Sequence, residues 1–286
     1  MRLVLVHGMR QEGKDPDVLQ DSWVAALHAA WKREGLAIPD YDLKMPFYGD
    51  ELERLTAEAR GSTEVVAKGG GGEAPSADEA DMMREYGEAL GITDEEIAAE
   101  RANEVVAKGM ANWGWVHAIA RIAERRVPLF GVIALDFVRQ VEAYLTRQHI
   151  TAAVDGIVRP ALTGERCVVV AHSLGTVVSY WLLRKAGPDC DVPLFVTAGS
   201  PLGIHTVKRR LQPPRPLARP EGVRRWVNAT DERDYVALYA RLDRDSFAPD
   251  IENFDDVTNS RADAHSITEY LSHTAVAKSI FHALTN

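Results

Sequence analysis

The chain has 286 residues, of which 46% are hydrophobic and 26% are charged, a composition typical of a soluble globular protein. Its formal net charge is −9, and because such a surface repels phosphates, no nucleic-acid partner is expected. The two cysteines suggest no disulfide framework, and an apolar run begins at Leu3, which leaves no room for a signal peptide. No window of about 18 apolar residues is present. We therefore expect a cytoplasmic protein without a membrane-spanning segment.

Apolar, β-branched runs alternate with helical patterns along most of the chain. The runs typical of strands are 3–6, 43–47, 167–171, 192–197 and 223–230. Apolar residues at helical spacing predict helices over 18–33, 154–162, 174–185 and 267–284. This alternation predicts a mostly parallel, doubly wound sheet, in which ligands bind at the carboxyl ends of the strands. Since single α/β domains reach this length, we expect one domain over residues 1–286.

Residues 50–147 differ in character from the rest, and we expect them to form a helical insertion within that domain. The run Gly69–Gly72 is typical of a flexible linker, and the acidic stretch 77–104 predicts solvated helices. Residues 64–69 and 104–109 are identical, which fits a duplicated helical piece and fits coincidence equally well. The apolar stretch from Val127 to Val138 fits a lid over acyl chains as well as a core helix. The insertion is therefore a candidate cap or lid.

A serine stands at a strand-to-helix corner of this pattern. Residues 167–171 are apolar and mostly β-branched, as in a strand buried on both faces, and a helical pattern follows Ser173 directly. Ala171 and Gly175 are small enough to let the chain bend there, which holds the Ser173 hydroxyl above the sheet edge. Ser173 is therefore the candidate nucleophile.

A serine nucleophile needs a base that takes its proton and a carboxylate that orients the base. Among the nine histidines, His265 is the best candidate, because it lies in a loop directly before the last predicted helix. His205, which follows a predicted strand, is its main competitor. Two carboxylates follow the strand that ends at Thr230, and Asp234 is preferred because it lies one turn further along. Asp231 is the alternative, since an aspartate there readily forms the turn itself.

The loop after the first predicted strand has two interpretations. Residues 8–15 nearly match a phosphate-binding loop, but Asp15 replaces its Ser or Thr, and acidic neighbours would repel phosphate. We prefer an oxyanion hole, in which backbone N–H groups stabilise the negative oxygen of an attacked carbonyl. Met9 would supply one N–H and Leu174 the other. His7 is then expected to be structural, bonded to neighbouring backbone.

Four pieces of sequence carry a family resemblance. They are Val-His-Gly-Met near the start, Ala-His-Ser-Leu-Gly at the corner, Ala-Gly-Ser-Pro-Leu after the next strand, and Trp-Val-Asn-Ala-Thr-Asp-Glu-Arg-Asp before the late histidine. Together they resemble the α/β-hydrolase superfamily, and within it bacterial serine esterases and lipases, including the GPI-inositol-deacylase-like lipases. The resemblance covers residues 1–48 and 148–286 and implies the α/β-hydrolase fold. Ala171 replaces the first glycine of G-x-S-x-G, as in some bacterial lipases.

The resemblance implies hydrolysis of carboxylic esters through an acyl-enzyme. Ser173 would attack, His265 would act as base and then as acid, and Asp234 would orient it. The partner would be a small-molecule or lipid ester, and no metal or organic cofactor is required. Thioesterases and serine peptidases share this machinery, and a catalytically silent scaffold acting as a binding or signalling module is the alternative. The sequence determines neither the substrate and its acyl-chain length nor the oligomeric state.

Overall fold

A computed structural model describes residues 1–64, 75–102, 114–127 and 130–286, except 213 and 240. Its centre is a six-stranded sheet in the order β2-β1-β3-β4-β5-β6, and every neighbouring pair of strands is parallel. The strands are β1 (Arg2–Val6), β2 (Asp42–Lys44), β3 (Cys167–His172), β4 (Val192–Ala198), β5 (Val223–Ala229) and β6 (Glu252–Phe254). The chain therefore has an α/β fold with a parallel sheet, as predicted.

The two edge strands differ most from the prediction. β2 was predicted as 43–47, but it ends at Lys44, because only Asp42, Leu43 and Lys44 pair with β1. β6 was not predicted, since its three residues are too few for a strand pattern to emerge. Because β2 and β6 are so short, they leave few unpaired backbone N–H and C=O groups at the edges of the sheet. The central strands β3 and β4 are buried.

Both faces of the sheet are covered by helices, because successive strand residues point to opposite sides. Leu3 and Leu5 belong to the core on one face, and Val4 and Val6 belong to the core on the other. On the first face lie α1 (Pro16–Arg33), α10 (Ile267–Ser272) and α11 (Thr274–Thr285), and on the second lie α7 (Gln148–Leu162) and α8 (Leu174–Ala186). The two layers of helices are those of a doubly wound sheet.

Two helix predictions were wrong in detail. α1 begins at Pro16 and not at 18, because the Asp15 carboxylate caps it by accepting from the N–H groups of Asp17 and Val18. The predicted helix 267–284 is two helices, α10 and α11, because His273 between them has an extended backbone, with φ −68° and ψ 129°. Both helices contact α1, and they also contact each other.

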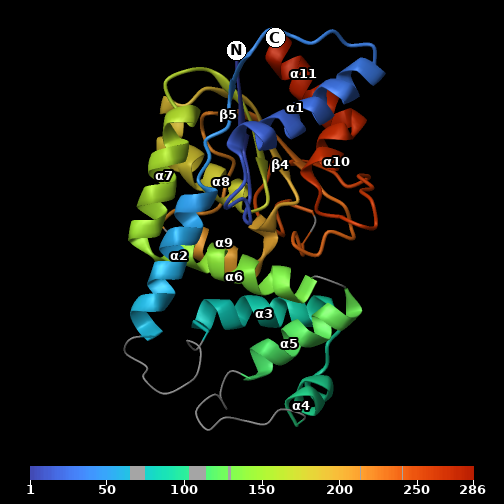
Figure 1. Cartoon of the computed structure of the whole chain (residues 1–286). Coiled ribbons are helices and arrows are strands. Elements are labelled where there is room, and N and C mark those ends of the chain that lie inside the picture. The colour runs from blue at the N-terminus through green and yellow to red at the C-terminus, as the bar shows by residue number, and fades with distance from the viewer. Residues whose placement is uncertain (65–74, 103–113, 128–129, 213, 240) are drawn as a thin grey trace.

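The segment between β2 and α7 is helical where it is described. It contains α2 (Gly49–Glu64), α3 (Ala77–Ala89), α4 (Asp94–Ala102), α5 (Gly114–Arg126) and α6 (Phe130–Thr146). Figure 1 shows α3 to α6 at the end of the molecule opposite the two chain termini. The glycine run lies outside the described residues, as do both identical segments apart from Glu64.

The prediction of solvated helices over 77–104 was wrong for α3. Met82, Met83 and Tyr86 are buried, and α3 packs against α5, α6 and the short helix α9 (His205–Leu211). α4 has no buried residue, as expected of a solvated helix. None of the described helices combines the length and the apolarity needed to cross a bilayer.

Candidate active site

Ser173 lies between β3 and α8 in a strained backbone conformation. Its φ of 54° and ψ of −130° are rarely adopted by residues other than glycine. Two glycines make room for this corner. A Cβ on Gly8 would lie 2.6 Å from the Cβ of Ser173, and a Cβ on Gly175 would lie 2.4 Å from the carbonyl oxygen of His7. The loop after β1 therefore contacts the serine corner directly.

His265 and Asp234 form a hydrogen-bonded pair. The Nδ1 atom of His265 lies 2.7 Å from Oδ2 and 2.9 Å from Oδ1 of Asp234. Because a carboxylate accepts, the proton of the neutral ring is on Nδ1, and Nε2 is free to accept another. Gly199 has a φ of 53° and lies against the pair, where a Cβ would approach Asp234 Oδ2 to 2.7 Å. Glycine fits at position 199 because it has no Cβ that would collide with the His265–Asp234 pair.

The Asp234 carboxylate is held on both of its oxygens. Oδ1 accepts from the N–H groups of Val236 and Ala237 at 3.1 and 3.4 Å, and Oδ2 accepts from the Tyr270 hydroxyl at 2.8 Å. The Asp234 side chain is fully buried. Hydrogen bonds on both oxygens fix this carboxylate in one orientation toward His265.

Asp231, the alternative acid, has the structural role considered for it. Its Oδ2 accepts from Arg233 Nη2 at 2.7 Å and from the N–H of Asn259 at 2.6 Å, and its Oδ1 accepts from the N–H of Arg233 at 2.8 Å. Burial raises the pKa of Asp231, but hydrogen bonds from Arg233 and Asn259 outweigh it and hold the pKa below its usual value. The structure brings Asp234, and not Asp231, to His265.

Ser173 Oγ and His265 Nε2 are both buried and have no hydrogen-bond partner among the described residues, so the structure shows no hydrogen bond between the candidate nucleophile and the candidate base. Ser173, His265 and Asp234 line the same cleft, which has a volume of about 1150 Å³. A buried polar atom without a hydrogen bond lowers the free energy of unfolding by about 1–3 kcal/mol. Each of these two atoms can therefore form a hydrogen bond with a bound molecule. They are the hydroxyl of the candidate nucleophile and the free nitrogen of the candidate base.

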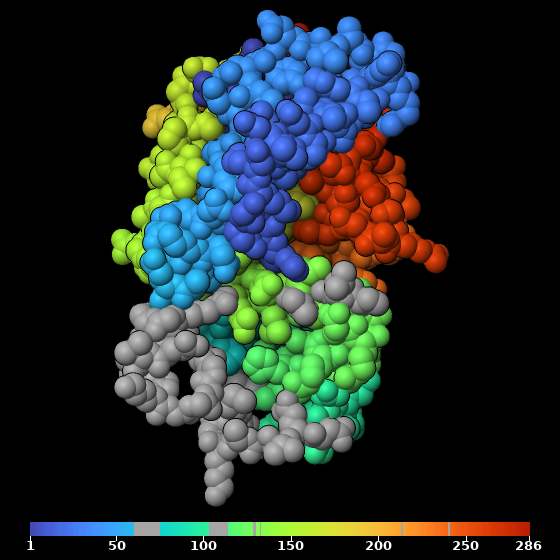
Figure 2. All heavy atoms as spheres, in the orientation of Figure 1, coloured from blue at the N-terminus to red at the C-terminus, as the bar shows by residue number. Residues whose placement is uncertain are grey.

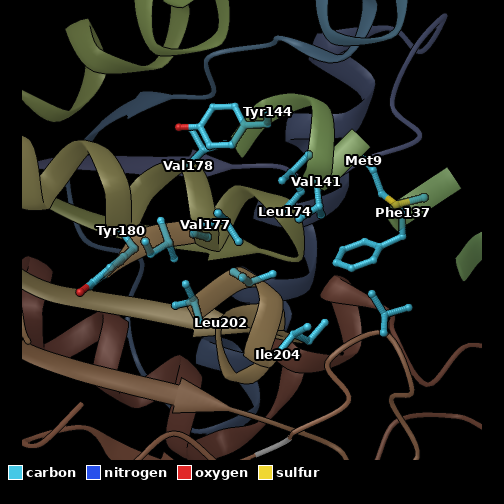
Figure 3. Packing of buried hydrophobic residues seen from close by; sticks show 14 of the residues in the cluster. Met9, Phe137, Val141, Tyr144, Leu174, Val177, Val178, Tyr180, Leu202 and Ile204 are labelled. Atoms are coloured by element: carbon cyan, nitrogen blue, oxygen red, sulfur yellow. The ribbon is translucent and has the colours of Figure 1, made fainter. Parts of the chain in front are cut away.

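The two predicted oxyanion donors flank the serine corner. Leu174 is the first residue of α8, so its N–H has no acceptor within the helix. Met9 lines the cleft directly after Gly8, and Gln11 Nε2 donates to its carbonyl oxygen at 2.8 Å. Figure 3 shows the side chains of Met9 and Leu174 in one buried cluster, with Phe137 of α6 beside Met9. Both side chains are therefore anchored in the same core.

His7 is structural, as preferred from the sequence. Its Nδ1 donates to the carbonyl of Gly8 at 2.8 Å, and its Nε2 accepts from the N–H of Tyr48 at 3.1 Å. The His7 ring stacks on the Tyr48 ring, with centroids 4.1 Å apart. Burial lowers the pKa of His7 to about 4, so the ring is neutral near pH 7. His7 therefore uses both of its ring nitrogens to fix the loop after β1 through hydrogen bonds.

That loop lacks the form of a phosphate-binding loop. The N–H of Gly13 donates to the Asp50 carboxylate at 2.7 Å, and Lys14 Nζ donates to Gln11 Oε1 at 3.0 Å. Asp15 caps α1, whose N-terminal N–H groups would otherwise face the phosphate. These contacts occupy the N–H of Gly13 and the Lys14 ammonium, which a phosphate-binding loop would direct at the phosphate.

The cleft combines an apolar wall with charged side chains. The apolar side chains that line it are Met9, Leu19, Trp23, Val127, Phe130, Ile133, Tyr235, Val236 and Ile267. Phe130 of α6 and Tyr235 lie with ring centroids 5.6 Å apart, so the insertion and the loop after β5 meet at this wall. Besides Asp234 and His265, the charged side chains that line the cleft are Arg10, Glu12, Lys14, Arg233, Arg261 and Asp263. Figure 2 shows the N-terminal part in blue, the C-terminal part in red and α6 in green meeting on one face.

His205, the competing base, is instead part of a contact between the insertion and the sheet domain. Its Nδ1 lies 3.0 Å from Oε2 of Glu85 on α3, which also accepts from the N–H of His205 at 2.9 Å. The other oxygen of Glu85 accepts from the N–H and the hydroxyl of Thr206, at 3.1 and 3.0 Å. The hydroxyl of Tyr86 on α3 donates to the carbonyl of Val236 at 3.1 Å. The insertion is therefore bonded to the loop that carries Asp234.

Two residues beside the His265–Asp234 pair were missed from the sequence. One is His172, whose ring lies 4.4 Å from the His265 ring, centroid to centroid. Tyr270 was assigned only to the last helix, and its hydroxyl reaches Asp234. The position of Tyr270 just after His265, on the inner face of the predicted helix, is the only sequence signal for it.

Comparison with family models, with curated proteins and with solved structures gives no match for this chain. Across the part of the chain that the structure describes, no group of three or more His, Cys, Asp or Glu side chains is arranged to hold a metal ion. The reactive groups that line the cleft are a hydroxyl, an imidazole and a carboxylate, and the imidazole is hydrogen-bonded to the carboxylate.

Proposed function

We propose that this chain is a serine hydrolase of the α/β-hydrolase superfamily that cleaves carboxylic esters through an acyl-enzyme. One observation carries the proposal: Ser173 Oγ and His265 Nε2 are buried, unsatisfied and in one cleft, while Asp234 holds His265 Nδ1. The strained backbone of Ser173, at the end of a buried parallel strand and the start of a helix, supports a nucleophile at that corner.

In this mechanism His265 Nε2 takes the proton of Ser173 Oγ as the oxygen attacks the ester carbonyl carbon. Asp234 stabilises the imidazolium that forms, and the N–H groups of Met9 and Leu174 donate to the oxyanion. The imidazolium then gives its proton to the alkoxide oxygen, and the alcohol leaves. A water molecule attacks the acyl-enzyme with His265 again as base, which releases the acid and restores the serine.

We assign the insertion, residues 50–147, the role of a cap on the cleft. Phe130 and Ile133 of α6 line the cleft together with Tyr235, so the apolar wall that would contact the acyl or alcohol group belongs partly to the insertion. This wall favours a small-molecule or lipid ester with an apolar group over a fully polar substrate.

The test uses a fluorophosphonate probe and p-nitrophenyl esters of short and long acyl chains. Wild-type protein should be labelled stoichiometrically, and Ser173→Ala and His265→Ala should lose labelling and hydrolysis. Ser179→Ala is the matched control, because Ser179 lies in α8 and, like Ser173, has a buried hydroxyl with no partner among the described residues. It should keep both activities.

Two results would contradict the proposal. Labelling that persists in Ser173→Ala would assign the nucleophile to another residue. Wild-type protein that neither reacts with the probe nor hydrolyses any of the esters would favour the silent scaffold.

A further inference from the structure

We propose that His172, the residue before the nucleophile, is a positioning residue that fixes the base His265 through the carbonyl oxygen of His265. The inference rests on the function proposed above, since it concerns the efficiency of that base. His172 itself does not exchange a proton in the reaction.

The contact joins two distant parts of the chain at the edge of the sheet. His172 is the last residue of β3, and its Nε2 lies 2.9 Å from the backbone oxygen of His265, 93 residues later. A carbonyl oxygen only accepts, so Nε2 carries the proton and donates. The strand that carries the nucleophile thereby holds the backbone of the loop that carries the base.

The ring of His172 also supports the ring of His265. The two ring centroids are 4.4 Å apart, with an angle of 39° between the ring planes. His172 is buried in turn between Trp23 of α1, whose ring is edge-on at 6.1 Å, and Tyr270 of α10 at 6.4 Å. Because helices on the same face of the sheet hold His172, it is a rigid support and not a mobile side chain.

His265 needs such a support because it lies in a loop between β6 and α10. The hydrogen bond that His265 Nδ1 donates to Asp234 fixes one atom of the His265 ring. By itself, it leaves the backbone of His265 free to shift around that atom. The loop is held at two successive carbonyls, by Asn259 Nδ2 on Ala264 at 2.8 Å and by His172 Nε2 on His265. With the backbone and Nδ1 both fixed, Nε2 has one position relative to Ser173.

His172 is suited to this role because it stays neutral. Burial lowers the pKa of His172 well below its usual value, and the positive charge that His265 acquires lowers it further. A neutral imidazole keeps one N–H for the carbonyl in every step, and it does not repel the His265 imidazolium. A lysine or arginine donor at this place would repel that imidazolium.

The experiment compares His172→Phe, which keeps a ring but no donor, with His172→Gln, whose amide places a donor at similar reach. A third variant, His172→Asn, has the same amide on a shorter side chain that does not reach the carbonyl. For a soluble p-nitrophenyl ester, we expect kcat to fall about 10- to 100-fold in the Phe and Asn variants with KM nearly unchanged. His172→Gln should recover most of the wild-type kcat.

A wild-type kcat in His172→Phe, or equal losses in His172→Gln and His172→Asn, would overturn the inference. If the Phe variant does not fold, as judged by circular dichroism, the comparison of Gln with Asn decides alone. Fluorophosphonate labelling separates the two proposals. Wild-type protein without labelling at Ser173 would refute the hydrolase, whereas labelled protein with kcat unchanged in every His172 variant would refute the positioning role only.

Discussion

The Tyr270 hydroxyl donates a hydrogen bond to Asp234 Oδ2 at 2.8 Å and accepts one from the N–H of Asp231 at 3.1 Å. It thus connects the carboxylate that holds His265 with the residue that forms the turn after β5. Burial and the nearby charge of Asp234 raise the pKa of Tyr270 far above its usual value, so the hydroxyl keeps its proton and remains a donor.

Replacing Tyr270 by Phe should therefore lower the free energy of unfolding by about 1.5–3 kcal/mol, since a buried carboxylate loses a donor. Urea denaturation at pH 7 measures the loss. Tyr41→Phe is the control, because the partly buried Tyr41 hydroxyl bonds to a neutral partner, His28 Nε2, at 2.6 Å, and its loss should cost about 1 kcal/mol or less. Equal losses in the two variants would contradict a special role of Tyr270.

Asp234→Asn and Asp231→Asn should separate catalysis from stability. An amide at 234 does not hold the His265 tautomer or stabilise the imidazolium, so kcat should fall by a factor on the order of 10⁴ while the fold persists. An amide at 231 leaves the Arg233 guanidinium without its carboxylate, which should lower the urea midpoint and affect kcat much less. A larger loss of kcat in Asp231→Asn would reverse the assignment of the acid.

The buried His7 should make the protein less stable in mild acid. The ordinary histidine pKa is 6.5 and that of His7 in the fold is about 4, so between these values the unfolded chain binds a proton that the folded chain does not. Stability therefore falls as the pH drops from about 6.5 to about 4, by about 3 kcal/mol from this residue.

The measurement for His7 is urea denaturation at several pH values in this window, for wild type and His7→Asn. An asparagine can donate and accept without titrating, so the difference between the two proteins should shrink as the pH falls. A wild-type curve parallel to that of the variant would show that His7 does not titrate as expected. His172, whose pKa is shifted in the same direction, should leave part of the slope in the variant.

Gly199→Ala should impair the site more than the fold. The added Cβ would lie 2.7 Å from Asp234 Oδ2 and 2.9 Å from His265 Nδ1, so the pair must move. A displacement of this size should lower kcat about 100-fold. Gly156→Ala in α7 is the control, because a Cβ there meets no atom within 4 Å and should leave kcat unchanged. Equal activity in both variants would mean that the pair tolerates displacement.

Glu85→Gln should loosen the insertion from the sheet domain. The amide cannot accept all the hydrogen bonds that Glu85 receives from His205 and Thr206, so the free energy of unfolding should fall by about 1.5–3 kcal/mol. Limited proteolysis should also cut α3 faster than in wild type. Glu88→Gln, at an exposed position of the same helix, is the control and should change neither. Resistance equal to wild type would show that other contacts anchor α3.

The central strands and the serine corner were predictable because their signals are local. β3 is a continuous apolar run, Ser173 follows it directly, and α8 continues with helical spacing. Nothing local decides between Asp231 and Asp234, which lie in the same turn. That choice depends on which carboxylate faces His265, and only the packed structure shows it.

The contacts beyond the pair were not predictable because their partners are far apart in the chain. His172 donates a hydrogen bond to a carbonyl 93 residues later, and Tyr270 donates one to a carboxylate 36 residues earlier.

The exposure of α3 was wrongly predicted for a different reason. Its acidic composition predicts exposure on average, but Glu85 and Asp78 are buried because α9 supplies Thr206, Arg209 and Arg210 as partners.

The order of strands in the sheet has a consequence for the synthesis of the protein. Val4 of β1 pairs with Val169 of β3, which follows much later in the chain. β1 therefore leaves the ribosome long before β3 is synthesised. Until then, only the three residues of β2 can pair with it. At about 5–20 residues per second, β1 waits about 8 to 30 seconds for β3. When β3 arrives, one pairing event brings Gly8 beside Ser173. Before β1 pairs with β3, no part of the site around Ser173 is assembled on the nascent chain.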